Sequence, residues 1–191
     1  IIRALRCAER PVESAVFPDI EIDGDSAARH LSGAIQIKTI GYDDIEKTDR
    51  KAFKDFIGYL EQTYPELHKV MDRDIVNDFS ILYRWKGKSS GEKPALFCAH
   101  IDVVPVESGT EGDWKFPPYS GAVNEGAVWG RGTQDIKVQL ITLLEAADAM
   151  IKKGITPERD IYFAFGHDEE TRRYDGADRI ASLLKERGVS F

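Results

Sequence analysis

The second half of the chain alternates short strand-like segments with two long helical ones, and this pattern most constrains the fold. The runs PALFCAHIDVV and RDIYFAFGHDEE are rich in β-branched and aromatic residues, as strands are. KVQLITLLEAADAMIKKG and DGADRIASLLKERG have the composition of helices that end at Gly154 and Gly188. Strands that alternate with long helices predict an α/β layer structure, in which one sheet is covered by helices.

The first half of the chain adds further elements to this sheet. Apolar spacing predicts a short helix from Ser26, with Ser26 as its N-cap, and a second helix in DRKAFKDFIGYLEQTYP that ends before Pro65. FSILYRWKG is a predicted strand that the polar turn KSSGEK joins to PALFCAHIDVV, so these two strands are expected to be adjacent and the sheet to be mixed. VNEGAVWGRG predicts a hairpin around Asn124 to Gly126.

Length and composition limit the class of protein. A chain of 191 residues with 42% hydrophobic content suits one globular domain, which we expect over residues 26–191 after an extended leader over residues 1–25. The 26 basic residues against 33 acidic ones give a net charge of −7, which excludes the basic footprint of a nucleic-acid binder. No apolar run reaches the length of a membrane span, and Cys7 and Cys98 form neither a disulfide framework nor a metal clip.

Polar side chains follow two of the predicted strands. His100 and Asp102 come at the end of one strand, and Glu169 and Glu170 follow another. Ligands of such sheets bind outside the carboxyl ends of the strands, so these residues are expected to face one crevice. Asp135, in the segment GRGTQDIK just before a long helix, is a further candidate.

Each candidate also has a simpler interpretation. His100 can be a histidine packed at a strand end, Asp135 can be the N-cap of the helix that follows it, and the glutamate pair can be a solvated charge run with the two arginines after it. Taken together, however, one histidine, one aspartate and two glutamates supply the ligand types of a hydrolytic zinc centre. Asp102 can then fix the tautomer of His100, and one glutamate can ligate while its neighbour accepts a proton from water.

These residues lie in an ordered set of motifs that resembles a known family. LFCAHIDVVPV, DWKFPPYSGAVNEGAVWGRGTQDIK and YFAFGHDEE, together with LSGAIQIKTI nearer the start, resemble the N-terminal part of the catalytic domain of zinc metallopeptidases of the carboxypeptidase S, aminoacylase and acetylornithine deacetylase type. The resemblance covers about residues 26–191. It implies a mixed central sheet flanked by helices and, through the carboxypeptidase S branch, a vacuolar or secreted destination.

The resemblance also implies a role for each candidate residue. His100 would ligate one Zn²⁺ and Glu170 the other, and Asp135 would bridge the two ions of a complete site. Glu169 would be the general acid/base, and Asp102 would hold His100 in orientation. The implied reaction is hydrolysis of an amide bond next to a C-terminal or N-acylated amino acid through a dizinc-activated water, with peptides or N-acyl amino acids as substrates.

The sequence departs from the family pattern near the glutamates and after residue 191. TRRYDGA follows the glutamates where a tight glycine turn is expected, and Ile136 follows Asp135 where many members have a second aspartate. Phe191 falls just before the strand expected to carry another carboxylate ligand. A C-terminal histidine ligand and the lid or dimerisation domain, through which a homodimer would form, are expected beyond it.

Two functional hypotheses follow from these departures. The chain is either the front half of a working zinc hydrolase, or a non-catalytic remnant or interaction module with an incomplete metal site. Arg131 and the KFPPYSG segment are expected near the cleft, although Arg131 alternatively braces its own turn through hydrogen bonds.

Overall fold

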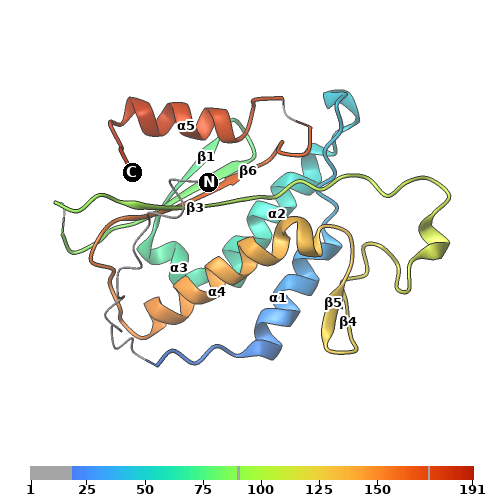
Figure 1. Cartoon of the computed structure of the whole chain (residues 1–191), viewed down its shortest axis with the longest axis horizontal. Coiled ribbons are helices and arrows are strands. Elements are labelled where there is room, and N and C mark those ends of the chain that lie inside the picture. Colours follow the sequence, from blue (N-terminus) through green and yellow to red (C-terminus); the bar gives the residue numbers. More distant parts are fainter. Residues whose placement is uncertain (1–18, 90, 172) are drawn as a thin grey trace, which may run out of the picture.

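The computed structural model describes residues 19–89, 91–171 and 173–191, and it shows one mixed sheet with helices on both faces (Figure 1). β3 runs parallel to β6, whereas β1 with β2 and β2 with β6 are antiparallel pairs. A separate hairpin, formed by β4 and β5, matches the predicted one. The mixed α/β architecture predicted from the sequence is confirmed. The strands are β1 (Asp72–Val76), β2 (Ser80–Trp85), β3 (Ala95–His100), β4 (Ala122–Asn124), β5 (Ala127–Trp129) and β6 (Ile161–Gly166).

The strand order, β1-β2-β6-β3, corrects one prediction. The sequence suggested that β2 and β3 are neighbours, but β6 lies between them. Most of β6 is buried, because its apolar side chains point to both faces of the sheet, which is typical of a central strand. β3 forms an edge instead, and the side chains of Leu96 and Phe97 are 37% and 42% exposed.

Among the described residues, four helices lie on one side of the sheet and one helix covers the other (Figure 1). α2 ends before Pro65 as predicted, but Pro65 then begins a short helix that the sequence analysis did not identify. The helices are α1 (Gly24–Gln36), α2 (Arg50–Thr63), α3 (Pro65–Val70), α4 (Val138–Lys152) and α5 (Ala177–Glu186), with short 3₁₀ turns η2 (Ile45–Lys47) and η3 (Glu111–Asp113).

The cap of α1 differs from the prediction. The Oδ1 atom of Asp23 accepts hydrogen bonds from the backbone N–H groups of Asp25 and Ser26, at 3.0 and 3.1 Å. Asp23 is therefore the N-cap, and Ser26 lies inside the first turn, where its hydroxyl accepts a bond from Arg29. The helix begins earlier than predicted, because a carboxylate at position 23 already satisfies its first donors.

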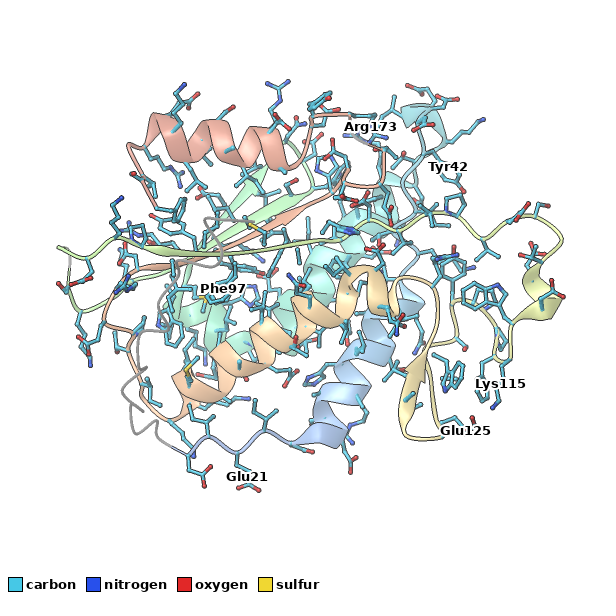
Figure 2. All side chains as sticks on the ribbon, viewed as in Figure 1. Glu21, Tyr42, Phe97, Lys115, Glu125 and Arg173 are labelled. Atoms are coloured by element: carbon cyan, nitrogen blue, oxygen red, sulfur yellow. The ribbon has the colours of Figure 1, made fainter. Side chains whose placement is uncertain are left out.

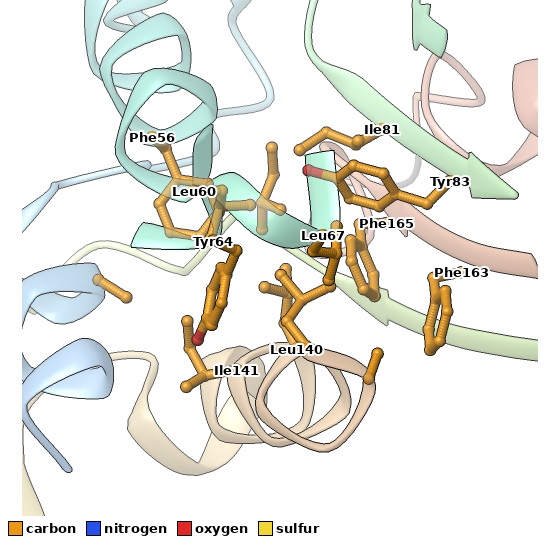
Figure 3. Close-up of a cluster of buried hydrophobic side chains, with 14 of the residues drawn as sticks. Phe56, Leu60, Tyr64, Leu67, Ile81, Tyr83, Leu140, Ile141, Phe163 and Phe165 are labelled. Carbon is orange, nitrogen blue, oxygen red and sulfur yellow. The ribbon is translucent and has the colours of Figure 1, made fainter. Parts of the chain in front are cut away.

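Alternation along the central strands divides the core into two layers. Ile81, Tyr83, Phe163 and Phe165 face the layer that contains α2, α3 and α4, where they meet large side chains of those helices (Figure 3). The intervening residues of β2 and β6 face α5, where they contact its buried positions, Ile180 and Leu184. Both faces of the sheet are thus covered, and the carboxyl ends of β3 and β6 are free to carry polar groups.

Most of the predicted leader, residues 1–18, lies outside the described residues. Within the part of the chain that the structure describes, no helix combines the length and the apolar character needed to cross a membrane.

Candidate metal centre

The parallel pairing of β3 with β6 brings the two motif-bearing strand ends together. His100 is paired with Gly166, the last residue of β6, and the N–H of Ile101 donates to the Gly166 carbonyl oxygen at 2.8 Å. The chain segments that leave the sheet here carry Asp102 on one side and the glutamate pair on the other. This is the strand-end crevice where ligands of α/β sheets bind.

A third segment, the irregular turn η4 (Thr133–Lys137), brings Asp135 to the same place. Gly132 precedes this turn with a φ of 82°, and a Cβ atom there would lie 2.2 Å from Cγ1 of Val103. The turn therefore packs directly against the chain that follows β3. Asp135 does not cap α4, because the N-cap position of this helix is Lys137. The Lys137 side chain makes no capping hydrogen bond.

The candidate ligands form one cluster. One nitrogen of His100 and one carboxylate oxygen each from Asp135 and Glu170 all lie within 4.8 Å of one another. The Nε2 atom of His100 is 3.1 Å from Oδ1 of Asp135 and 3.8 Å from Oε2 of Glu169. The structure thus brings together the four residues to which the sequence analysis gave ligand or acid/base roles.

Asp102, the fifth candidate, is completely buried and connects two of these segments. Its Oδ1 atom is 3.3 Å from Nδ1 of His100, which also lies 3.0 Å from the Asp102 backbone oxygen. Its two carboxylate oxygens accept hydrogen bonds from the backbone N–H groups of Glu169 and Glu170, at 3.2 and 2.9 Å. The sequence analysis expected the contact with His100 but not the bonds to the glutamates, because no local pattern signals a contact between distant loops.

The donor set fits a divalent metal ion. If a metal ion displaces the second imidazole proton, the Nδ1–H of His100 stays directed at Asp102 and the Nε2 lone pair faces Oδ1 of Asp135, 3.1 Å away. A cation between them would satisfy both, and imidazole nitrogen with carboxylate oxygen is a ligand set of zinc-type ions.

Negative charge dominates this cluster. Burial lowers the pKa of His100, but the hydrogen bond and charge of Asp102 outweigh burial and raise this pKa to about 9. Burial, and then the charge of Asp135, raise the pKa of Glu170 above its ordinary value. The raised pKa of His100 reflects the carboxylates around its imidazole, whereas that of Glu170 reflects burial first and the neighbouring carboxylates second.

Lys137 is a structural residue of this site that the sequence analysis missed. Its ammonium group is buried, donates to the carbonyl oxygens of Ala34 and Ile37 at 2.9 and 2.8 Å, and lies 4.8 Å from the ring centroid of Phe56. Burial lowers its pKa to about 7. The lysine joins the C-terminal end of α1 to the turn that carries Asp135.

The loop after the glutamates is held by a buried carboxylate rather than by glycines. Asp168 accepts hydrogen bonds from the backbone N–H groups of Asp175 and Gly176, at 2.6 and 2.9 Å. Arg173 donates to the carbonyl oxygen of Tyr42 (Figure 2), and it forms no ion pair with Glu169 or Glu170 in the described part of the loop. The described part of this loop is thus held by Asp168 where a tight glycine turn was expected, and Arg172, one of the two arginines of the charge-run interpretation, lies outside the described residues.

Comparison with known proteins identifies the family. The sequence profile of peptidase family M20/M25/M40 matches residues 96–191, which is half of the chain and contains all five candidate residues. The chain belongs to this family. Such a peptidase depends on a metal, in agreement with the ligand cluster.

Relatives of this M20 chain include carboxypeptidases and acyl-amino acid hydrolases. Carboxypeptidase S of Saccharomyces cerevisiae is 39% identical over 170 residues, which cover 85% of the chain and 30% of that protein. Probable carboxypeptidase S-like 2 of Dictyostelium discoideum is 38% identical over 164 residues, with the same coverage. Human N-fatty-acyl-amino acid synthase/hydrolase PM20D1 is 35% identical over 163 residues, which cover 84% of the chain and 32% of that protein. The chain thus spans about a third of the length of these relatives.

Solved structures show the same fold. The dipeptidase Dug1p of Saccharomyces cerevisiae superposes with a TM-score of 0.67 at 22% identity, over 87% of the M20 chain and 36% of that protein. Human carnosine dipeptidase 1 gives a TM-score of 0.66 at 19% identity, over 87% of the chain and 37% of that protein.

Proposed function

We propose that the protein of which this M20 chain forms part is a zinc hydrolase that cleaves an amide bond next to a C-terminal or N-acylated amino acid. The main support for this proposal is the cluster of His100, Asp135 and Glu170, whose ligand atoms lie within 4.8 Å of one another, with Glu169 beside them. The substrate class is supported by relatives named as carboxypeptidase S and as N-fatty-acyl-amino acid hydrolases.

His100 would hold one Zn²⁺ and Glu170 the other, and Asp135 would be a ligand that both ions share. When bound, the two ions would supply Lewis acidity, which polarises the amide carbonyl and lowers the pKa of the attacking water. Three protein ligands are few for two ions, since zinc sites usually have three or four each. The remaining ligands would come from the part of the protein that lies outside this chain, as would any lid domain or homodimer contact.

Glu169 is the proposed general acid/base. Its side chain is 59% exposed, so it reaches solvent and substrate, and its Oε2 atom lies 3.8 Å from Nε2 of His100. It would accept the proton of the attacking water and deliver it to the departing amine nitrogen. The backbone N–H groups of Glu169 and Glu170 donate hydrogen bonds to the buried Asp102. These bonds fix the backbone position from which the two glutamate side chains extend.

Two substitutions in the longer protein separate chemistry from metal binding. Glu169→Gln should reduce hydrolysis of an N-acyl amino acid or peptide by at least about 100-fold with an unchanged zinc content, because it removes the proton acceptor alone. Asp135→Ala should lower both zinc content and hydrolysis. Near-normal rates with Glu169→Gln would show that another group is the base, and a zinc-free wild-type protein would favour the non-catalytic alternative.

A further inference from the structure

The motif LSGAIQIKTI, residues 31–40, contains none of the five candidate residues of the metal centre. Its first part forms the end of α1, and its last residues belong to an extended segment that runs beside the chain after β3. We call this segment, residues 37–42, the linking segment. Its hydrogen bonds reach all three parts of the chain that carry the candidate ligands.

The linking segment holds the chain on both sides of Asp102. The hydroxyl of Thr39 donates to the carbonyl oxygen of Ile101, which is next to the candidate histidine ligand. The carbonyl oxygen of Thr39 accepts a hydrogen bond from the N–H of Val103 at 2.9 Å, and the N–H of Gly41 donates to the Val103 carbonyl oxygen at 3.0 Å. Thr39 is completely buried, so its hydroxyl would be unfavourable there without the bond to Ile101.

The two ends of the linking segment are bonded to the other ligand-bearing parts of the chain. At its start, the carbonyl oxygen of Ile37 accepts a hydrogen bond from the ammonium group of Lys137 at 2.8 Å, and Lys137 lies two residues after Asp135. At its end, the carbonyl oxygen of Tyr42 accepts a bond from Arg173, in the loop after the glutamates (Figure 2). One continuous strip of backbone is therefore bonded to the supports of all three ligands.

The linking segment also packs directly against the site. A Cβ atom at Gly41 would lie 3.3 Å from Oδ2 of Asp102 and 3.1 Å from Cγ2 of Thr171, the residue after Glu170. The glycine thus lets the backbone lie against both the buried aspartate and the glutamate loop. A shift of the linking segment would therefore displace both by direct contact.

We propose that the linking segment positions the three ligands relative to one another, with Thr39 as its main positioning residue. This inference rests on the proposed function, and it concerns residues that are not themselves candidate ligands. Groups that orient metal ligands from outside typically contribute about 10- to 100-fold to metal affinity. Thr39 acts through the backbone on either side of Asp102, so its effect belongs at the lower end of this range.

Zinc binding by the longer protein tests this role. Thr39→Val keeps the shape of the side chain but removes the hydroxyl, so the Kd for Zn²⁺, measured by competition with a chelating dye, should rise by about 10-fold. Thr39→Ser keeps the hydroxyl and should bind zinc with nearly the wild-type Kd. An unchanged Kd for Thr39→Val, or an equal rise for Thr39→Ser, would overturn the proposal.

Thr63→Val is the matched control. The hydroxyl of Thr63 donates to the carbonyl oxygen of Tyr59 at 2.7 Å within α2, so this variant loses the same kind of bond outside the linking segment. Its Kd for zinc should equal that of the wild type. The Tm of each metal-free protein is measured in parallel. A lower Tm for Thr39→Val together with a wild-type Kd would show a purely structural role and overturn the proposal.

A spectroscopic measurement tests ligand geometry independently of affinity. Co²⁺ in place of zinc has a visible absorption spectrum that depends on the arrangement of its ligands. Thr39→Val should shift the bands of the Co²⁺-loaded protein, whereas Thr63→Val should not, and identical spectra for all the proteins would refute a role in positioning. A wild-type protein that binds no zinc would overturn the proposed function and this inference with it, whereas zinc binding that is unchanged in Thr39→Val would overturn this inference alone.

Discussion

Replacing Asp102 should destabilise the protein more than any other single change at the site. The carboxylate is fully buried and accepts two backbone N–H bonds, from Glu169 and Glu170. A hydrogen bond to a charged group contributes about 1.5–3 kcal/mol, and Asp102→Ala would leave both donors without an acceptor. The alanine variant also no longer buries a charge, and the desolvation cost that it avoids offsets part of this loss. We therefore expect the free energy of unfolding to fall by about 3–5 kcal/mol.

Asp102→Asn refines the test, because the amide keeps one acceptor oxygen and turns an NH₂ group towards the other donor. It should cost about half as much as the alanine variant. The measurement is urea denaturation followed by circular dichroism, with Asp113→Ala, an exposed aspartate of η3, as the control expected within about 0.5 kcal/mol of wild type. A loss below about 1 kcal/mol for Asp102→Ala would refute the reasoning.

Three further perturbations test other parts of the site and core. Lys137→Met keeps the apolar stem but leaves the carbonyl oxygens of Ala34 and Ile37 without a donor. Urea denaturation should therefore show that the free energy of unfolding falls by about 2–4 kcal/mol. Lys54→Met, at an exposed lysine, is the control and should change it little. Gly132→Ala should cost about 2–4 kcal/mol, because its φ of 82° is strained for alanine and the new Cβ would clash with Val103, whereas Gly112→Ala meets no neighbour and serves as the control. Burial lowers the pKa of His68 from 6.5, so the unfolded state binds more protons below that pH and stability should fall on acidification. His68→Gln should therefore reduce the change in Tm between pH 7 and pH 5, and an unchanged pH profile would contradict this assignment.

Most secondary structure followed from the sequence, because it depends on local patterns. The period of apolar residues located α2, and helix-forming composition located α4 and α5. The positive φ angles of Gly154 and Gly188 agree with their predicted role as helix ends. The cap of α1 was misplaced because Asp23 and Ser26 are both good N-cap residues, and local pattern does not rank them. Strand order was also wrong, because the pairing of β6 depends on tertiary packing between distant segments.

The composition of the candidate site was predictable, whereas its supports were not. Motifs identified His100, Asp135 and Glu170, and the structure brings them together, while their roles stay predictions. The buried position of Lys137 had no local signal, because a lysine in a turn is usually exposed. The bonds from the glutamate loop to Asp102 join residues far apart in the sequence, and single-sequence patterns do not report such contacts.

The strand order also determines when the site can form during folding. β2 and β3 follow one another in the chain, yet both must wait for β6 before either gains its partner in the centre of the sheet. A nascent chain that ends before β6 exposes two unpaired strand edges, which favours slow folding and transient association with other chains. Because His100 is aligned with Gly166, the same event that closes the sheet also brings the histidine to the glutamates. Sheet closure and assembly of the ligand cluster should therefore be a single step in the folding of this protein.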